Sequence, residues 1–497
     1  MLDKIDLEKK LGKNEFKEIM DKLTVKLGIL QRECKDLKIP VMIVFEGFGA
    51  SGKGTLINQL IGPLDPRGFC VYAVKGASAE ERRRPFLWRF WIKTPAAGRI
   101  AIFDQSWYRR VLIDRFDRVT TERQLAYAFQ EIASFEEALV DDGTVIIKFF
   151  LDITKKEQSK RFARLRANKE TAWRVSKGDL KRNKYFREYQ RMNEEMLQKT
   201  DTAVAPWTIV EAMDRKYAAV KIIRKVIERL EKQIAVVKEK NASETIADTT
   251  AEEREGFKSS LLNHVDLSLH YTKEEYKKKI SELQKKLTLL HSELYAQKIP
   301  VILGFEGWDA GGKGGAIKRL TECMDPRGYV VNPTAAPNDT EKAHHYLWRF
   351  WKDIPKTGHV AIFDRTWYGR VMVERIEHFC TREEWKRAYK EINDMEAHLA
   401  QDGAIVIKFW MQIDKEEQQR RFTDRQNTPE KQWKITAEDW RNREKWELYE
   451  SAVDEMLIRT STTYAPWVIV EGNCKYYARV KVLETVVSAI EERLKRK

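Results

Sequence analysis

The sequence predicts an α/β protein made of two tandem three-layer α/β/α domains, each with a parallel sheet. The first observation behind this prediction is an internal repeat, in which matching segments recur exactly one domain length later, without insertion or deletion from about residue 41 to 211. The second is the alternation of short apolar runs with polar, amphipathic stretches inside each copy. Continuous apolar runs are typical of parallel strands that are covered on both faces.

Several motifs carry the repeat, and all of them keep the same spacing. The segment VMIVFEGFGASGKG (41–54) recurs as VILGFEGWDAGGKG (301–314). The motifs DPRG, LWRFW, AIFD and APW each recur at the same offset. This uniform offset indicates that one whole domain was duplicated in tandem, and it excludes a short-period solenoid.

Each copy is expected to open with an amphipathic helix and to continue with five strands. Apolar residues recur at helical spacing from Phe16 to Leu30, and again from Tyr276 to Leu290. Apolar runs predict the strands of the first copy, with counterparts in the second copy, at 41–45, 69–74, 100–103, 144–151 and 207–211.

A polar segment separates the two copies. Residues 238–256 lack apolar periodicity and have the composition of a linker. We therefore predict an N-terminal domain at 1–237 and a C-terminal domain at 257–497.

The charge balance favours polyanionic partners. The chain has 91 Lys and Arg against 76 Asp and Glu, a formal net charge of +15. Such a surplus suits a phosphate-rich substrate, nucleic acid or an anionic lipid surface, and does not choose among them. Hydrophobic residues make up 42% of the chain, which excludes a protein that is disordered over most of its length.

Cysteine usage and the apolar pattern indicate a cytoplasmic protein. The five cysteines are scattered and form no CxxC pair, which argues against a disulfide framework and against a zinc site. The first residues, MLDKIDLEKK, are charged and lack the apolar stretch of a secretory signal. No apolar run approaches the length of a membrane span, so we expect no membrane partner.

A phosphate-binding loop is predicted in each copy. GFGASGK (47–53) and GWDAGGK (307–313) both fit the pattern GxxxxGK, between an apolar strand and a helix. Glycines let backbone N–H groups turn toward a phosphate, the helix N-terminus adds a favourable dipole, and Lys53 or Lys313 supplies a positive charge. The alternative is a Gly-rich turn that binds nothing, and two matches in the correct context make it the weaker interpretation.

Both loops depart from the usual pattern at the next position. The hydroxyl residue that holds Mg²⁺ in P-loop NTPases is replaced by Gly54 or Gly314. This argues against an ordinary ATPase or GTPase. The second loop instead carries a carboxylate at Asp309, where the first has Gly49.

A second carboxylate ends the AIFD strand of each copy, at Asp104 and Asp364. An apolar run that ends in Asp is the Walker B pattern, whose carboxylate engages Mg²⁺ directly or through water. A helix-capping Asp is the alternative. The aromatic residues that follow, Trp367 and Tyr368, are expected to pack in the core rather than to stack on a base.

A basic segment follows the fourth strand. In P-loop phosphotransferases a mobile basic segment at this place closes over the transferring phosphate as a lid; an ordinary solvated helix face is the alternative. The matching segment 159–174 of the first copy is also basic but has Leu165 where the second copy has Arg425. In the second copy the cationic residues of this segment are Arg420, Arg421, Arg425, Lys431 and Lys434.

Together, EGWDAGGKG, FDRTWYGR, the RF…R…W pattern and APW resemble the polyphosphate kinase 2 family over most of both halves. The tandem arrangement is similar to the two-domain class of that family. This resemblance implies P-loop kinase-like domains with helical lids. It also implies Mg²⁺ or Mn²⁺ as cofactor and transfer of the terminal phosphoryl group of inorganic polyphosphate to AMP, which gives ADP.

The resemblance also assigns residues. It implies that the loop Asp is Asp309, the Walker B Asp is Asp364 and the adjoining Arg is Arg365. Asp364 is expected to be a metal ligand, and Asp309 is expected either to join it at the metal or to orient the acceptor. The further catalytic residues implied are Lys313 and Arg425. The residues expected to bind phosphate are Gly307, Gly311, Gly312, Lys313, Gly314, Arg421 and Lys434.

The first copy departs from the family pattern at three of these positions. It has Gly49, Gln105 and Leu165, and it keeps Lys53 and Asp104. Losing a transition-state cation costs on the order of 10³-fold in rate or more. We therefore predict that the C-terminal copy is catalytic and that the N-terminal copy is a degenerate partner.

Three other interpretations stay open. ADP in place of AMP would be a change of acceptor within the same family. An ATP-dependent nucleotide kinase would share the loop and the lid. A nucleic-acid-binding module would explain the basic charge, but not two carboxylates beside a phosphate loop, so no nucleic acid is expected. The two fused copies are expected to pack as a pseudo-dimer, and further dimerisation of the chain stays open.

Overall fold

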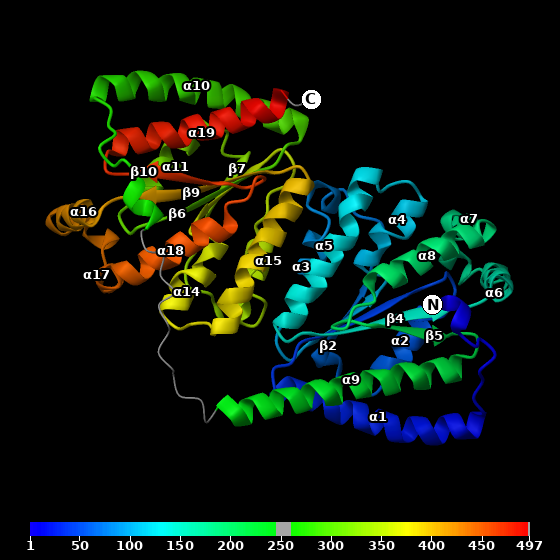
Figure 1. Ribbon diagram of the computed structural model, residues 1–497. Helices are drawn as coiled ribbons and strands as arrows, with labels where there is room; N and C mark the ends of the chain where they lie inside the picture. Colours follow the sequence, from blue (N-terminus) through cyan, green and yellow to red (C-terminus); the bar gives the residue numbers. More distant parts are fainter. Residues whose placement is uncertain (245–259, 496–497) are drawn as a thin grey trace. The chain divides into compact units, whose positions relative to one another are not determined.

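A computed structural model gives the structure of residues 1–244 and 260–495. The chain forms two compact units that follow the sequence repeat (Figure 1). Each unit also includes one short segment from the other copy, since residues 78–88 belong to the second unit and residues 339–345 to the first.

The first unit is built on a five-stranded sheet in which every described strand pair is parallel. Its strand order is β2-β3-β1-β4-β5, so β1 lies between β3 and β4. The chain therefore reverses its direction of travel across the sheet at β1, and such a switch point is where ligands bind in open α/β sheets. The strands are β1 Val41–Gly47, β2 Phe69–Ala73, β3 Ile100–Asp104, β4 Val145–Asp152 and β5 Trp207–Glu211.

The second unit repeats this topology. Its sheet has the order β10-β9-β6-β8-β7, again with parallel pairs and with the first strand of the copy at the centre. The strands are β6 Val301–Gly307, β7 Tyr329–Pro333, β8 Val360–Asp364, β9 Ile405–Gln412 and β10 Trp467–Glu471. The predicted α/β class, the strand positions and the parallel pairing are confirmed in both copies.

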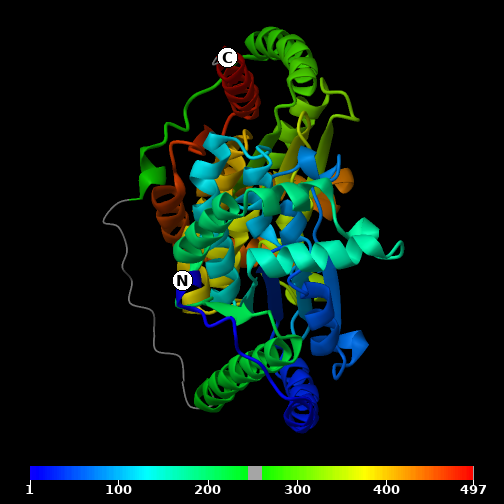
Figure 2. The ribbon, with the colours of Figure 1, turned by 90° about the vertical axis from the view of Figure 1, so that its right-hand side faces the viewer.

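Helices cover both faces of each sheet (Figure 1). In the first unit α1 and α9 lie side by side on one face together with α2, while α5 and α8 lie on the other (Figures 1 and 2). The helices of this unit are α1 Lys13–Asp36, α2 Lys53–Ile61, α3 Trp88–Trp91, α4 Ile113–Phe116, α5 Glu122–Asp141, α6 Lys155–Ala167, α7 Lys177–Lys184, α8 Phe186–Thr200 and α9 Arg215–Glu244.

The second unit has the same layers. Helices α10, α11 and α19 cover one face of its sheet, and α15 and α18 the other (Figure 1). Its helices are α10 Lys273–Gln297, α11 Lys313–Thr321, α12 Asp339–Lys342, α13 Trp348–Lys352, α14 Val373–Ile376, α15 Arg382–Gln401, α16 Lys415–Asn427, α17 Ala437–Glu444, α18 Trp446–Thr460 and α19 Lys475–Lys495, of which α12 falls within the exchanged segment.

The predicted linker differs from the structure at its start. Helix α9 continues to Glu244, so residues 238–244 are helical. The remainder of the predicted linker, 245–256, lies outside the described residues. No described helix is both long and apolar enough to span a lipid bilayer.

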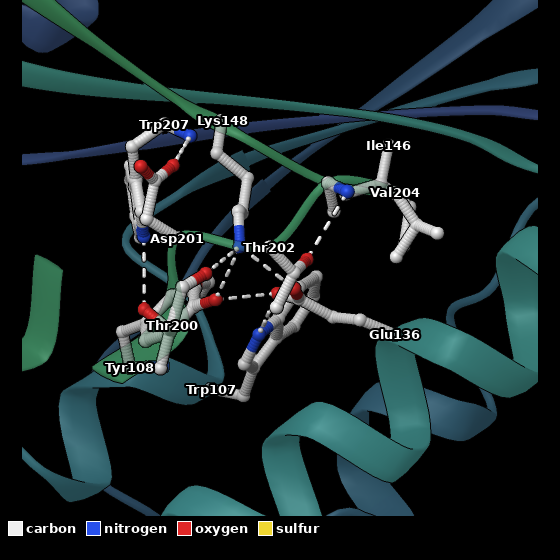
Figure 3. A network of polar contacts seen from close by, with 12 residues as sticks. Trp107, Tyr108, Glu136, Ile146, Lys148, Thr200, Asp201, Thr202, Val204 and Trp207 are labelled. Carbon is white, nitrogen blue, oxygen red and sulfur yellow. Dashed lines mark hydrogen bonds and ion pairs between the residues drawn. The ribbon is translucent and has the colours of Figure 1, made fainter. Parts of the chain in front are cut away.

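A buried charged network braces each unit, and Figure 3 shows the one in the first unit. The Lys148 ammonium of β4 donates to Glu136 of α5 at 2.8 Å, to the Tyr108 hydroxyl at 2.9 Å and to the Thr200 carbonyl at 2.8 Å. Tyr108 and Trp107 donate to the same carboxylate. The network therefore fixes the segment that follows the Walker B strand against β4 and the end of α8.

The second unit repeats the network with Lys408, Glu396, Tyr368 and Thr460. Tyr368 and Trp367 are fully buried and donate to Glu396, which confirms that they pack in the core. Burial raises the pKa of Glu396 and lowers that of Lys408. Because both side chains are buried, the charges of Lys408 and Glu396 are stabilised by each other rather than by water.

We predict that Lys408→Met lowers the free energy of unfolding by about 3–5 kcal/mol, because it leaves the Glu396 carboxylate buried without a counter-charge. Urea unfolding followed by tryptophan fluorescence measures the change. The matched control is Lys386→Met, which removes an exposed lysine from α15. Equal stability of the two variants would contradict a bracing role for the network.

Candidate active site

The phosphate loop of the second unit joins β6 to α11. Gly307 has φ +142°, and a Cβ there would lie 2.6 Å from the Met411 carbonyl oxygen, so only glycine fits. Gly312 has φ +111° and precedes the first residue of α11. A Cβ at Gly314 would meet nothing within 4 Å. The missing hydroxyl of the usual motif therefore leaves open space beside the first turn of α11.

Lys313 holds its ammonium over the loop. Its Nζ donates to the carbonyl oxygens of Gly307 at 2.7 Å and Trp308 at 3.4 Å. In the described part of the chain, Lys313 forms no ion pair within 4 Å. Its charge is therefore available to a phosphate that enters the loop.

Asp309 ties the loop to two other parts of the unit. Its carboxylate accepts from Arg365 Nη2 at 3.3 Å and from Asn442 Nδ2 of α17 at 3.0 Å. Its backbone carbonyl accepts from Gln418 of α16 at 3.1 Å. The structure therefore brings the two predicted residues Asp309 and Arg365 together. It also adds Asn442 of α17, which the sequence did not single out.

Arg365 has a backbone conformation that non-glycine residues rarely adopt. Its φ is +66°, and its N–H donates to the Phe305 carbonyl at 3.0 Å. The next residue, Thr366, donates from its N–H at 2.7 Å and from its hydroxyl at 2.8 Å to Glu306. These contacts stabilise the strained turn that carries the guanidinium toward Asp309.

Glu306 is the residue behind this turn. It is buried in β6, and burial raises the pKa of its carboxyl group. We did not single it out from the sequence, although a charged residue that ends an apolar strand in both copies was a usable signal.

Asp364 ends β8, which pairs with β6 in register Phe305↔Asp364. It therefore lies beside the strand that leads into the phosphate loop. Within residues 1–244 and 260–495, no protein group donates a hydrogen bond to its carboxylate. Asp364 is thus the carboxylate of this site that is open to a cation.

A basic cavity of about 280 Å³ adjoins the phosphate loop. Its walls come from the loop, from α16, and from the start of α19. The charged residues that line it are Arg421, Asp424, Arg425, Lys475 and Arg479. The predicted residues Arg421 and Arg425 therefore share one cavity with Gly311 and Gly312.

Arg421 also braces the loop. Its guanidinium donates to the carbonyls of Ala310 at 2.8 Å and Gly472 at 2.6 Å, and to Glu417. The sequence predicts phosphate binding for Arg421 and does not predict these contacts with the loop. Lys434 ends the short 3-10 helix Pro429–Lys434, and its side chain, like that of Lys431, lies outside the described part of the structure.

An aromatic contact joins the loop to the lid helices. The rings of Trp308 and Trp446 stack with centroids 3.6 Å apart and planes 8° from parallel. The Trp308 indole donates to Gln412 at 2.9 Å. The first unit has Phe48 stacked on Phe186 at the same place, with centroids 4.6 Å apart. Helix α18 is thereby packed against the loop.

The first unit keeps the loop but not the acidic contact. Lys53 donates to the carbonyls of Gly47 and Phe48, as Lys313 does in the second unit. At Gly49, the counterpart of Asp309, a Cβ would lie 3.1 Å from Phe162 and 3.3 Å from the Asp179 carboxylate. The Asp179 carboxylate of α7 thus lies beside the loop, and Arg182 pairs with it at 2.9 Å.

The arrangement in the second unit is suited to transfer between two anions. The loop and the cavity provide positive charge for one anionic group, while Asp309 and Arg365 define a second position across the loop. Positioning and charge stabilisation supply most of the catalysis of phosphoryl transfer. Because the attacking group is itself an anion, such a transfer needs neither a nucleophilic side chain nor a general base.

Comparisons with known proteins agree with this geometry. The family model described as polyphosphate kinase 2 matches residues 10–238 and 270–497. The polyphosphate:AMP phosphotransferase of Pseudomonas aeruginosa is 39% identical over 497 residues, which is 100% of both chains. A crystal structure described as a polyphosphate kinase 2 from the same species superposes with a TM-score of 0.86 at 38% identity, over 100% of both chains. The NDP-polyphosphate phosphotransferase 3 of Ruegeria pomeroyi is 36% identical over 44% of this chain and 73% of its own.

The first unit offers a test of the buried strand glutamate. Burial raises the pKa of Glu46 from 4.5 to about 7. Between these two values the folded chain holds a proton that the unfolded chain releases, so the free energy of unfolding falls as the pH rises. Ionisation of Glu46 alone is expected to lower the free energy of unfolding by about 3 kcal/mol across this pH range.

Glu46→Gln should therefore remove this part of the pH dependence, as measured by urea unfolding at several pH values from 4.5 to 8. Exposed Glu15→Gln on α1 is the control, and should leave the pH dependence unchanged. Parallel pH profiles for Glu46→Gln and the unsubstituted protein would show that the carboxyl titrates normally in the folded state.

Proposed function

The chain belongs to the polyphosphate kinase 2 family, and we propose that it transfers the terminal phosphoryl group of inorganic polyphosphate to AMP, which gives ADP. The observation that carries the proposal is the basic cavity beside the phosphate loop. Its lining has four cationic side chains against one carboxylate, and it contains no aromatic side chain.

The lining of the cavity favours polyphosphate over ATP as the donor. A nucleoside donor needs an apolar or aromatic surface for its base, whereas a chain of phosphates needs positive charge along its length. The first need is unmet in this cavity and the second is met. The same argument favours polyphosphate over nucleic acid, because nucleic-acid sites combine basic residues with aromatic stacking surfaces.

In the proposed reaction an α-phosphate oxygen of AMP attacks the terminal phosphorus of polyphosphate. One phosphoanhydride bond forms, the bond to the next phosphate breaks, and the shortened chain leaves as an oxyanion. The attacking oxygen is already anionic, so no general base is required. Loop N–H groups and Lys313 hold the transferred group, and Arg365 and Arg425 offset charge that spreads between the two substrates.

Two carboxylates suit a magnesium ion, with manganese as the alternative. Mg²⁺ in phosphotransferases is held by one or two carboxylates and completed by substrate phosphates and water. The open carboxylate of Asp364 fits this donor set, and Asp309 is the second candidate. When bound, the ion would neutralise phosphate charge. Asp309 also places Arg365 and Asn442 where an acceptor would lie.

The full-length relatives favour AMP as the acceptor. The relative that spans the whole chain is named as an AMP phosphotransferase, whereas the relative named for nucleoside diphosphates matches only 44% of the chain. We place this reaction in the reducing cytoplasm, where free cysteines such as these five are usual.

Activity should depend on the second phosphate loop and not on the first. We predict that Lys313→Ala and Asp309→Asn each lower the rate of ADP formation by on the order of 10³-fold, because each removes a group that positions phosphate or acceptor. Lys53→Ala is the matched control, since it removes the same contacts in the first unit, and should change the rate by less than about threefold. Chromatography of nucleotide products from polyphosphate, AMP and Mg²⁺ measures the rate.

A donor comparison on the unsubstituted protein checks the substrate itself. Polyphosphate should support ADP formation from AMP, and ATP at the same phosphate concentration should not. Faster turnover with ATP would mean that the chain is a nucleotide kinase with an ordinary donor.

A further inference from the structure

We propose that the N-terminal unit is a second polyphosphate-binding site, one that holds the polyanion but does not transfer its phosphate. This inference rests on the proposed function for the nature of the ligand. Its observation is separate, however, because it comes from residues of the first unit that the proposed reaction does not use.

The positions of the first unit that correspond to the cavity lining carry the same net charge, although the residues differ. Arg425 and Arg479 of the second unit correspond to Leu165 and Ala219, so two cations are missing. The single cavity carboxylate, Asp424, corresponds to Arg164. Four cations and one acid in the second unit thus become three cations in the first, with the same net charge.

The bracing arginine is retained in this exchange. Arg161, the counterpart of Arg421, donates to the carbonyls of Ala50 at 3.2 Å and Ser51 at 3.0 Å in the loop. It also donates to Ala212 beyond β5 at 2.9 Å and pairs with Glu157 at 2.7 Å. The wall between the phosphate loop and the start of α9 is therefore built in the same way in both units.

The other two arginines are not paired within 4 Å with an acidic side chain of the described residues. Arg164 and Arg215 are exposed, and neither forms an ion pair or a side-chain hydrogen bond in the part of the chain that the structure describes. Partial burial lowers the pKa of Arg215, repulsion from Arg161 and Arg164 adds to this effect, and Glu157 opposes it. Cations that repel one another at close range favour a bound polyanion.

The acceptor side of the first unit, by contrast, is lost. Gly49 and Gln105 replace Asp309 and Arg365, and the Asp179 carboxylate lies against the loop at Gly49. An anionic acceptor would meet the Asp179 carboxylate, which is paired with Arg182, and would find no counterpart of Arg365. The first unit is therefore suited to hold a donor chain and unsuited to accept a phosphate from it.

Isothermal titration of the full chain with tripolyphosphate at physiological salt tests the proposal. We expect two sites per chain in the unsubstituted protein and one in the double variant Arg164→Glu/Arg215→Glu. Both residues are exposed, so the variant should fold, which circular dichroism confirms. The charge-matched control Arg123→Glu/Arg224→Glu, at exposed positions of α5 and α9, should keep two sites.

A single site in the unsubstituted protein, or two sites in the Arg164→Glu/Arg215→Glu variant, would overturn the proposal. Site numbers are measured without AMP and without turnover, so these outcomes do not depend on whether the chain phosphorylates AMP. Failure of the proposed function would instead appear as absent ADP formation in a protein that still binds tripolyphosphate.

Discussion

The contact between Asp309 and Arg365 is the interaction on which the proposed catalytic geometry depends. It joins the phosphate loop after β6 to the strained residue after β8, and Asn442 of the lid completes it. The buried Glu306 holds the strained turn in place through Thr366. A carboxylate and a guanidinium are thereby fixed across the loop from Lys313, where an anionic acceptor can be aligned with a phosphate donor.

The duplication shows that scaffold and chemistry can separate. Both units retain the parallel sheet, the glycine loop and the buried lysine network. At the phosphate loop the first unit has Gly49 where the second has Asp309, so the first lacks this carboxylate although its sheet has the same topology. The charge of the donor side is kept by different residues, which is the outcome expected if polyanion binding is useful without transfer.

Much of the fold could be predicted from the sequence because the relevant signals are local. Continuous apolar runs located all five strands of each copy, and the glycine pattern located the loop. The approach of Asp309 to Arg365 followed only from the family resemblance, since 56 residues separate them along the chain. Asn442 and Trp446 were missed because their role depends on how the lid helices fold back onto the loop.

The most direct test of the account is the double variant Asp309→Gly/Arg365→Gln, which gives the second unit the residues that the first unit has at these two positions. The measurement is the rate of ADP formation from polyphosphate and AMP. The account predicts a loss on the order of 10³-fold or more, with tripolyphosphate still bound in the second unit. A rate within about tenfold of the unsubstituted protein would contradict it, because the difference between the two units would then lie elsewhere.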